Sequence, residues 1–227
     1  AGADDSMRAT LALEIAQAML FIDLGVAFDA VPHSYGRSWF PCFDNFVERC
    51  TFEFRVRADA GRTVTANGLL MGTETHGPGD RTFLWYLDRS IPAFLASVAA
   101  GAYAVVNDAY TSITGATVPV QLAARAVDTV AMKASFLHLR DAFDGFEQDF
   151  GPYQWPRVGF TLTTEGAMEH ATNICYPAWL ADGSLAHERI MAHELAHHWF
   201  GNLITCSRAE EMWINEGMAD LCGYMFA

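Results

Sequence analysis

Hydrophobic and polar positions alternate in the first half of the chain. The segment TFEFRVRA, residues 51–58, places Phe52, Phe54 and Val56 between charged residues. A period of two residues is typical of a strand that buries one face. The pattern therefore predicts a half-buried strand.

Turn signals separate further runs of this kind. Asn67-Gly68 and the cluster HGPGD at 76–80 have turn chemistry. The runs at 69–75 and 82–87 flank the second turn and are predicted to pair as a hairpin. The first half of the chain is therefore expected to be rich in strands.

The spacing of apolar residues changes near residue 124. Apolar residues then recur every three or four positions, which is typical of an amphipathic helix: Met132, Phe136, Leu139, Phe143, Phe146 and Phe150. We interpret this stripe as helix core rather than a cofactor site, and Gly151-Pro152 as its end. RVGFTLTT at 157–164 predicts another strand. We expect an α+β fold with a β-rich N-terminal domain over residues 1–123 and a second domain over residues 124–227.

A second helix is predicted by DGSLAHERIMAHELAHHWFGN, residues 182–202. Ser184 is the expected N-cap, Glu188 suits the positive end of the helix, and Gly201 is the expected terminator. A third helix is expected from near Arg208 to the end of the sequence.

Composition and charge restrict the partners. Hydrophobic residues make up 52% of the 227 residues, enough for a sizeable core, and the net charge is −13. An acidic surface argues against nucleic acid and anionic membranes as partners. The apolar run 11–26 contains Glu14 and Asp23, and we expect no membrane-spanning segment.

The five cysteines are widely spaced and form no CxxC pair. We interpret them as ordinary buried cysteines, which favours the cytoplasm over export. The first residues, AGADDSMRAT, lack the basic start and the apolar segment of a signal peptide. A start without Met fits a removed leader or an excised fragment.

The predicted second helix carries His193 and His197 at positions i and i+4. Side chains at this spacing lie on one helix face, so two imidazole nitrogens can bind one zinc ion at about 2.0–2.1 Å. Glu194, one position after His193, is placed to reach a water without being a ligand. This HExxH pattern predicts a catalytic metal site.

A catalytic zinc ion usually takes three protein ligands. Glu216 in WINEGMAD is the candidate third ligand, on the next helix. Asp220, one turn later, is a candidate acceptor for the outer N–H of a ligating histidine. A surface helix can contain HExxH by chance, so the prediction depends on the combination of HExxH with Glu216 on the next helix. His138, His187 and His198 do not share the same face, and we assign them no metal role.

Several segments resemble one known family. HELAHHWFGNLIT followed by WINEG, with eighteen residues between His197 and Glu216, resembles the M1 family of zinc aminopeptidases, which are gluzincins. EGAMEH at 165–170 is similar to the GxMEN exopeptidase motif of that family. GRSWFPCFDN at 36–45 and FEQDFGPYQWPRVGF at 146–160 are similar to further family segments, in the same order.

The resemblance implies a fold and a set of roles. A saddle-like β-rich domain would precede the first part of a thermolysin-like α/β catalytic domain. His193, His197 and Glu216 would hold one zinc ion, and Glu194 would be the general base. The carboxylate of Glu169 would bind the free α-amino group of a peptide substrate, and the backbone of Gly166 and Ala167 would line the cleft.

The sequence departs from the family at two places. His170 stands where the family usually has Asn, and we expect it to have a supporting role in substrate binding. The family also carries a second amine-binding residue before the Phe-Pro-Cys segment, and FDAVPHSYGRSW at 28–39 offers no clear match.

The family uses a tyrosine well beyond the glutamate ligand to stabilise the oxyanion, and Tyr224 is too close to Glu216 to be its counterpart. We therefore expect a fragment of a larger enzyme, and the isolated chain is expected to lose activity without that tyrosine. Two alternatives to an aminopeptidase stay open: a thermolysin-like zinc endopeptidase, and a non-catalytic binding module that contains zinc.

Overall fold

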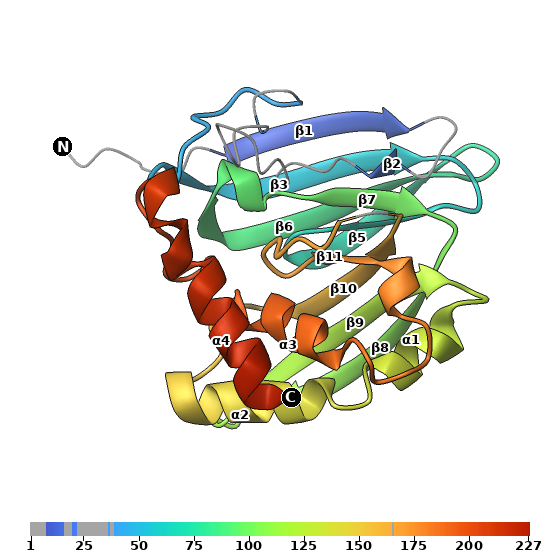
Figure 1. Cartoon of the computed structure of the whole chain (residues 1–227). Coiled ribbons are helices and arrows are strands. Elements are labelled where there is room, and N and C mark those ends of the chain that lie inside the picture. Colours follow the sequence, from blue (N-terminus) through green and yellow to red (C-terminus); the bar gives the residue numbers. More distant parts are fainter. Residues whose placement is uncertain (1–7, 16–19, 22–35, 37–38, 165) are drawn as a thin grey trace.

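Two layers of strands and four α-helices make up the described part of the chain (Figure 1). The computed structural model describes residues 8–15, 20–21, 36, 39–164 and 166–227. The fold is α+β, as expected, and strands dominate the first half.

The first sheet has four strands in the order β1-β3-β6-β5. Their bounds are β1 (Arg8–Ile15), β3 (Arg49–Ala58), β5 (Leu69–His76) and β6 (Asp80–Pro92). Phe52, Phe54 and Val56 of β3 are at most 1% exposed, which confirms the predicted half-buried strand. Strands β5 and β6 pair antiparallel, which confirms the predicted hairpin.

The second sheet has the order β11-β10-β9-β8. Its strands are β8 (Tyr103–Thr111), β9 (Thr117–Arg125), β10 (Val158–Thr163) and β11 (Ile174–Pro177). Strand β10 is parallel to both β9 and β11. Residue 123 lies inside β9, so strands from both sides of the expected domain boundary share this sheet. The division into two domains at residue 123 stays a prediction.

A small third sheet lies beside the first one and has the order β2-β7-β4. Its strands are β2 (Leu20–Phe21), β4 (Thr63–Ala66) and β7 (Val98–Gly101). Asn67-Gly68 forms the turn between β4 and β5, and Gly68 has a φ of +85°. The predicted turn is therefore confirmed.

The four α-helices all follow β9 in the chain. They are α1 (Thr129–Ser135), α2 (Leu139–Phe150), α3 (Glu188–Ala196) and α4 (Glu216–Phe226). Helix α2 lies below the second sheet, and α4 runs down one side of the molecule in front of both layers (Figure 1). Phe143 of α2 packs against Tyr110 of β8, with ring centroids 5.3 Å apart.

The predicted single helix over the apolar stripe is wrong in one respect. The helical hydrogen bonding stops at Phe136 and resumes at Leu139, so α1 and α2 are separate. Phe136 turns into the core instead, where its ring packs edge-on against Phe160 and Tyr176. The end of the helix at Gly151 is confirmed.

The predicted bounds of the next helix are also wrong. Helix α3 begins at Glu188, and its N-cap is His187. Ser184 instead donates its hydroxyl to Asp182 Oδ1 at 2.7 Å, within a local turn. Helix α3 ends at Ala196, with His197 as its C-cap. The third predicted helix consists of a 3-10 helix, Ala209–Ile214, followed by α4.

Arg157 joins the two layers. Its guanidinium donates from Nε to Gly68 O at 2.8 Å, from Nη2 to Ala66 O at 2.6 Å and from Nη1 to Gln121 Oε1 at 2.6 Å. It also lies 4.7 Å from the centroid of the Trp85 ring. Burial lowers the pKa of Arg157 to about 9, so the group is still a cation at neutral pH. One side chain thus holds β9 and the β4–β5 turn in register.

None of the helices in the described ranges is both long and apolar enough to cross a membrane. The five cysteines all lie in described segments and form no disulfide with one another.

Candidate metal centre

Helix α3 brings the two predicted histidine ligands together. His193 lies in its last turn, and His197 follows directly with helical backbone angles, φ −56° and ψ −24°. The two Nε2 atoms are 3.0 Å apart. The spacing of four residues therefore produces the convergence that the sequence predicts.

Glu216, the first residue of α4, completes a triangle of donor atoms. Its Oε2 lies 3.6 Å from His193 Nε2 and 3.5 Å from His197 Nε2. Corners of a tetrahedron that are about 2.0–2.1 Å from its centre are roughly 3.3 Å apart. The three donors, which we call the donor triangle, therefore fit a small divalent cation in size and in chemistry.

The orientation of the His197 ring is set by the chain just after it. His197 Nδ1 lies 2.9 Å from Phe200 O. A carbonyl oxygen only accepts, so Nδ1 carries a hydrogen, and Nε2 is the nitrogen that can bind a metal once it has lost its proton. Gly201 makes this turn possible: its φ is +128°, and a Cβ there would lie 3.0 Å from His197 Nδ1.

Helix α4 approaches α3 closely at Gly223. A Cβ at this position would lie 2.9 Å from Arg189 O and 3.3 Å from His193 Cβ. The absence of a side chain therefore lets α4 carry Glu216 to within reach of both histidines.

Asp220 lies beside this contact, but its main partner is a cation. Its Oδ1 accepts from Arg189 Nη1 at 2.6 Å and is 3.7 Å from His193 Nδ1. The latter distance is too long for a hydrogen bond. A role for Asp220 in orienting His193 stays a prediction.

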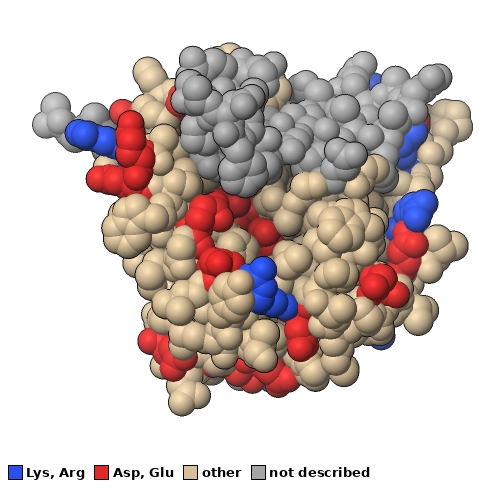
Figure 2. Space-filling view, viewed as in Figure 1, with Lys and Arg blue, Asp and Glu red and all other residues tan. Residues whose placement is uncertain are grey.

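The site is negatively charged. Acidic side chains gather on the face of the molecule over α3 and α4 (Figure 2). Burial lowers the pKa of His197, but the carboxylates of Glu169, Glu216 and Glu194 outweigh it and raise that pKa to about 10. Burial alone would raise the pKa of Glu216, but its bonds to His193 and His197 hold it well below its usual range. The negative potential of these carboxylates favours the binding of a cation.

Glu194 and Glu169 also lie close to His197. One carboxylate oxygen of each lies within 4.8 Å of the other and of a ring nitrogen of His197. Their side chains are nearly buried, at 5% and 4% exposure. Burial, together with the charges of Glu169 and Glu216, raises the pKa of Glu194 to about 8. Within the described residues, Glu194 Oε2 and Glu169 Oε1 have no hydrogen-bond partner.

The segment that carries Glu169 is short and tightly held. Met168 and Cys175 exchange two backbone hydrogen bonds, at 2.9 and 3.0 Å, which close a loop beside β11. Gly166 and Ala167 are half-buried at its entrance, and Glu165 lies outside the described residues. His170 is fully buried in this loop, and burial lowers its pKa to about 3. Its ring is therefore neutral over the physiological pH range.

The remaining predicted features are only partly described. Most of the stretch at 28–39, where no second amine-binding residue was assigned, lies outside the described residues, as do residues 37–38 of the Phe-Pro-Cys segment. His198 is 1% exposed, and its ring bonds Tyr153 Oη at 2.6 Å and the N–H of Thr172 at 3.3 Å. These contacts involve both ring nitrogens, and the absence of a metal role for His198 stays a prediction.

Sequence reasoning missed the residues that support the site. Phe200, through its carbonyl, and Gly223, through its lack of a side chain, are examples. Asn202 is another: its Nδ2 donates to Glu169 O at 2.8 Å. The motif HHWFGN contains two of these three residues, but the spacing alone does not show that their roles involve distant backbone atoms.

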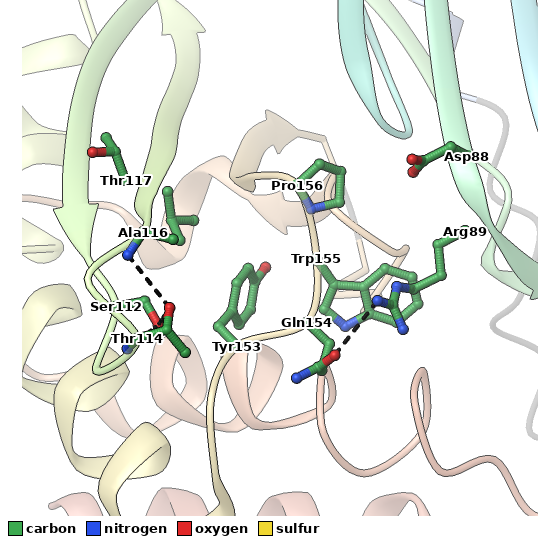
Figure 3. Close-up of a pocket in the computed structure, with 11 residues that line it drawn as sticks. Asp88, Arg89, Ser112, Thr114, Ala116, Thr117, Tyr153, Gln154, Trp155 and Pro156 are labelled. Atoms are coloured by element: carbon green, nitrogen blue, oxygen red, sulfur yellow. Dashed lines mark hydrogen bonds between the residues drawn. The ribbon is translucent and has the colours of Figure 1, made fainter.

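A separate pocket of about 300 Å³ lies away from the donor triangle (Figure 3). It is lined by β6, the β8–β9 turn and the segment Tyr153–Pro156. Arg89 covers the Trp155 ring at 5.6 Å and bonds Gln154 Oε1 at 3.5 Å. It shares no residue with the metal centre.

The fold and the site together define a class: an α+β protein in which HExxH on one helix and a glutamate on the next bring three metal-type donor atoms together. Comparison with known proteins agrees. Residues 137–227 match the Peptidase family M1 domain. Leucine aminopeptidase 2 of Chaetomium globosum is 31% identical over 192 residues, which cover 81% of this chain and 29% of that protein.

Solved structures show the same architecture. An M1 zinc metallopeptidase of Deinococcus radiodurans, solved as a mutant with a Tyr-Ser-Ala substrate, superposes with a TM-score of 0.75 at 23% identity, over 84% of this chain and 43% of that one. Another structure of an M1 zinc metallopeptidase from this organism gives 26% identity and a TM-score of 0.68, with coverage of 84% and 43%.

The chain belongs to the M1 family of peptidases. It spans less than a third of the length of the Chaetomium relative.

Proposed function

We propose that the protein is a zinc-dependent aminopeptidase that removes residues from the N-terminus of peptides. The observation that carries this proposal is the donor triangle with Glu194 and Glu169 beside it. Two histidines and a glutamate are a donor set that catalytic zinc takes. The M1 zinc metallopeptidase of Deinococcus, at 26% identity, supports the choice of metal.

His193, His197 and Glu216 would hold the ion. When bound, zinc supplies a Lewis acid that polarises a carbonyl and lowers the pKa of water toward about 7. Glu194 is the general base in this proposal. A cation bound in the donor triangle would favour the ionised form of Glu194. Its carboxylate then takes a proton from the attacking water, and the resulting acid gives that proton to the leaving amine as the C–N bond breaks.

Glu169 would give the enzyme its preference for the N-terminus of a peptide substrate. A carboxylate this close to the donor triangle forms a charge-assisted hydrogen bond with a free α-ammonium group and fixes its distance from the bond that is cut. Because Glu169 is nearly buried and Oε1 has no partner among the described residues, an incoming cation compensates a desolvated charge. Peptides with a free N-terminus are therefore the proposed substrates.

Zinc content and hydrolysis of leucine p-nitroanilide test the proposal. Glu194→Gln should lower kcat by about 10²–10⁴-fold, the usual contribution of a general base, and leave the zinc content unchanged. Glu188→Gln is the matched control, because Glu188 lies on the same helix and bonds His138 at 2.8 Å instead. Full activity in Glu194→Gln would disprove the assigned base.

An endopeptidase would share HExxH and the downstream glutamate, and Glu169 is the feature that separates the two activities. N-acetylation of the anilide should abolish hydrolysis by an aminopeptidase, since the acetyl group removes the cation that Glu169 binds. Equal rates on free and acetylated substrates would favour an endopeptidase. Stoichiometric zinc without hydrolysis of either would favour a zinc-containing binding module.

A further inference from the structure

Asn202 makes three contacts that link separate parts of the metal centre. Its backbone N–H donates to His197 O at 2.9 Å, which ties it to the ligand-bearing turn. Its side-chain Nδ2 donates to Glu169 O at 2.8 Å. Its own carbonyl accepts from Arg49 Nη2 at 2.5 Å, from β3 of the first sheet. Asn202 is fully buried.

The turn that contains Asn202 therefore orients both sides of the site. Phe200 O orients the His197 ring, and two residues later Asn202 Nδ2 holds the peptide group of Glu169. The Asn202 bond joins the backbone of the Glu169 loop directly to a residue that is itself bonded to a metal ligand. A change of this bond would move the Glu169 carboxylate relative to the donor triangle.

Other hydrogen bonds also hold the Glu169 loop, but their partners lie at the β4–β5 turn and not in the metal centre. Asn67 Nδ2, at the β4–β5 turn, donates to Ala171 O at 2.6 Å. Thr172 Oγ1 accepts from Gly68 N at 2.6 Å, and Thr172 has a φ of +64°. These bonds shape the loop against the first layer of strands. Asn202, in contrast, is bonded both to Glu169 and to His197.

We propose that Asn202 is a positioning residue that sets the distance between the amine-binding carboxylate of Glu169 and the donor triangle. This inference rests on the proposed function, because it assumes that Glu169 binds the substrate amine. The distance selects an amine on the carbon next to the reacting carbonyl and rejects one that is a carbon further away.

Calorimetric binding of three hydroxamates tests this inference without turnover. Alanine hydroxamate carries an α-amine, β-alanine hydroxamate carries its amine one carbon further away, and N-acetylalanine hydroxamate carries none. The zinc-loaded wild-type protein should bind the α-amine compound best. Asn202→Ala should lower the ratio of α-amine to β-amine affinity by about tenfold, in line with the cost of small misplacements. Zinc affinity, measured by chelator competition, should stay unchanged.

Two further variants separate positioning from loss of structure. Asn202→Ser keeps a hydroxyl donor and should restore part of the ratio. Asn67→Ala removes the bond to Ala171 O from the same loop, together with the bonds of Asn67 to Leu95 O and Ser97 N. It should lower the affinity for all three compounds in proportion, with the ratio unchanged. If Asn202→Ala and Asn202→Ser both keep the wild-type ratio, or if Asn67→Ala changes it as strongly, the inference is wrong. A wild-type protein that binds the acetylated compound as well as the free amine would instead overturn the proposed function.

Discussion

At the scale of single residues, the titratable groups near the donor triangle are almost as buried as the apolar core. His170 is 0% exposed, His197 is 1% exposed, and Glu169 and Glu194 are 4% and 5% exposed. A buried ionisable group is neutral, is paired, or binds a cation. His170 is the neutral case, whereas His197 and the two glutamates compensate one another.

His170 makes the fold sensitive to acid. Burial lowers its pKa from 6.5 to about 3, whereas the unfolded chain keeps the ordinary value. Between these values the unfolded state binds a proton that the folded state does not, so stability falls as the pH decreases from about 6.5 toward 3. One such histidine accounts for about 3 kcal/mol between pH 7 and pH 4.

His170→Asn should remove this part of the acid sensitivity. Urea unfolding of wild type and variant, followed at pH 7 and at pH 4, measures the difference in the free energy of unfolding. We expect the wild-type protein to lose about 3 kcal/mol more than the variant over this range. Equal losses in the two proteins would show that protonation of His170 is not linked to unfolding.

The ligand residues can be predicted from the sequence because their geometry is local. The distance between His193 and His197 depends only on the helix that carries them, and the position of Glu216 follows from the next helix. Asn202 and Arg49 are different. Their partners lie 33 and 153 residues away, and only the folded chain brings those backbone atoms together.

At the scale of elements, the pair α3 and α4 carries the candidate metal centre. The sequence predicts both helices, but it misplaces the start of α3. Ser184 has the chemistry of an N-cap and is used in a local turn with Asp182 instead. The break between α1 and α2 was also missed, because Phe136 continues the apolar spacing while the backbone leaves the helix. Packing of its ring against β10 and β11 decides the outcome.

The close contact between these helices predicts opposite effects for two glycine substitutions on α4. Gly223→Ala would place a methyl group 2.9 Å from Arg189 O, so α4 must move away from α3 and carry Glu216 with it. Gly217→Ala meets only Trp213 Cβ at 3.9 Å on an exposed face. It should stabilise the helix by up to about 1 kcal/mol.

Chelator competition and thermal unfolding measure both effects. We expect Gly223→Ala to bind zinc about tenfold more weakly, equivalent to 1.4 kcal/mol, and to unfold at a lower temperature. Gly217→Ala should bind zinc as the wild type does. Wild-type zinc affinity in Gly223→Ala would show that close packing at this point is not needed for the donor triangle.

At the scale of the whole molecule, a bound ion should join the two C-terminal helices. Zinc that binds the folded chain adds RT ln(1 + [L]/Kd) to its stability, about 2.7 kcal/mol at a hundredfold excess over Kd. For a chain of this size that corresponds to a rise in Tm of roughly 5–10 °C. EDTA should reverse the rise. Glu216→Ala lacks one ligand and should show a much smaller response; an equal response would place the ion elsewhere.

The layers of the molecule were predicted less completely than its site. Alternation in TFEFRVRA and the turn at HGPGD correctly predict strand β3 and the β5–β6 hairpin of the first sheet. The second sheet was not predicted, because its parallel pairing joins β9 to β10 across more than thirty intervening residues. Apolar runs show that both strands are buried but not which strand is the neighbour.

The hydrogen bonds of Arg157 matter for any attempt to produce residues 137–227, the segment that matches the family, as a separate protein. A truncated chain that starts at residue 137, where the match to the family begins, would omit every acceptor that receives a hydrogen bond from this guanidinium. It would also expose the free edge of β10 that β9 normally covers. We therefore expect that residues 137–227 do not fold on their own, and a chain trimmed to them should aggregate.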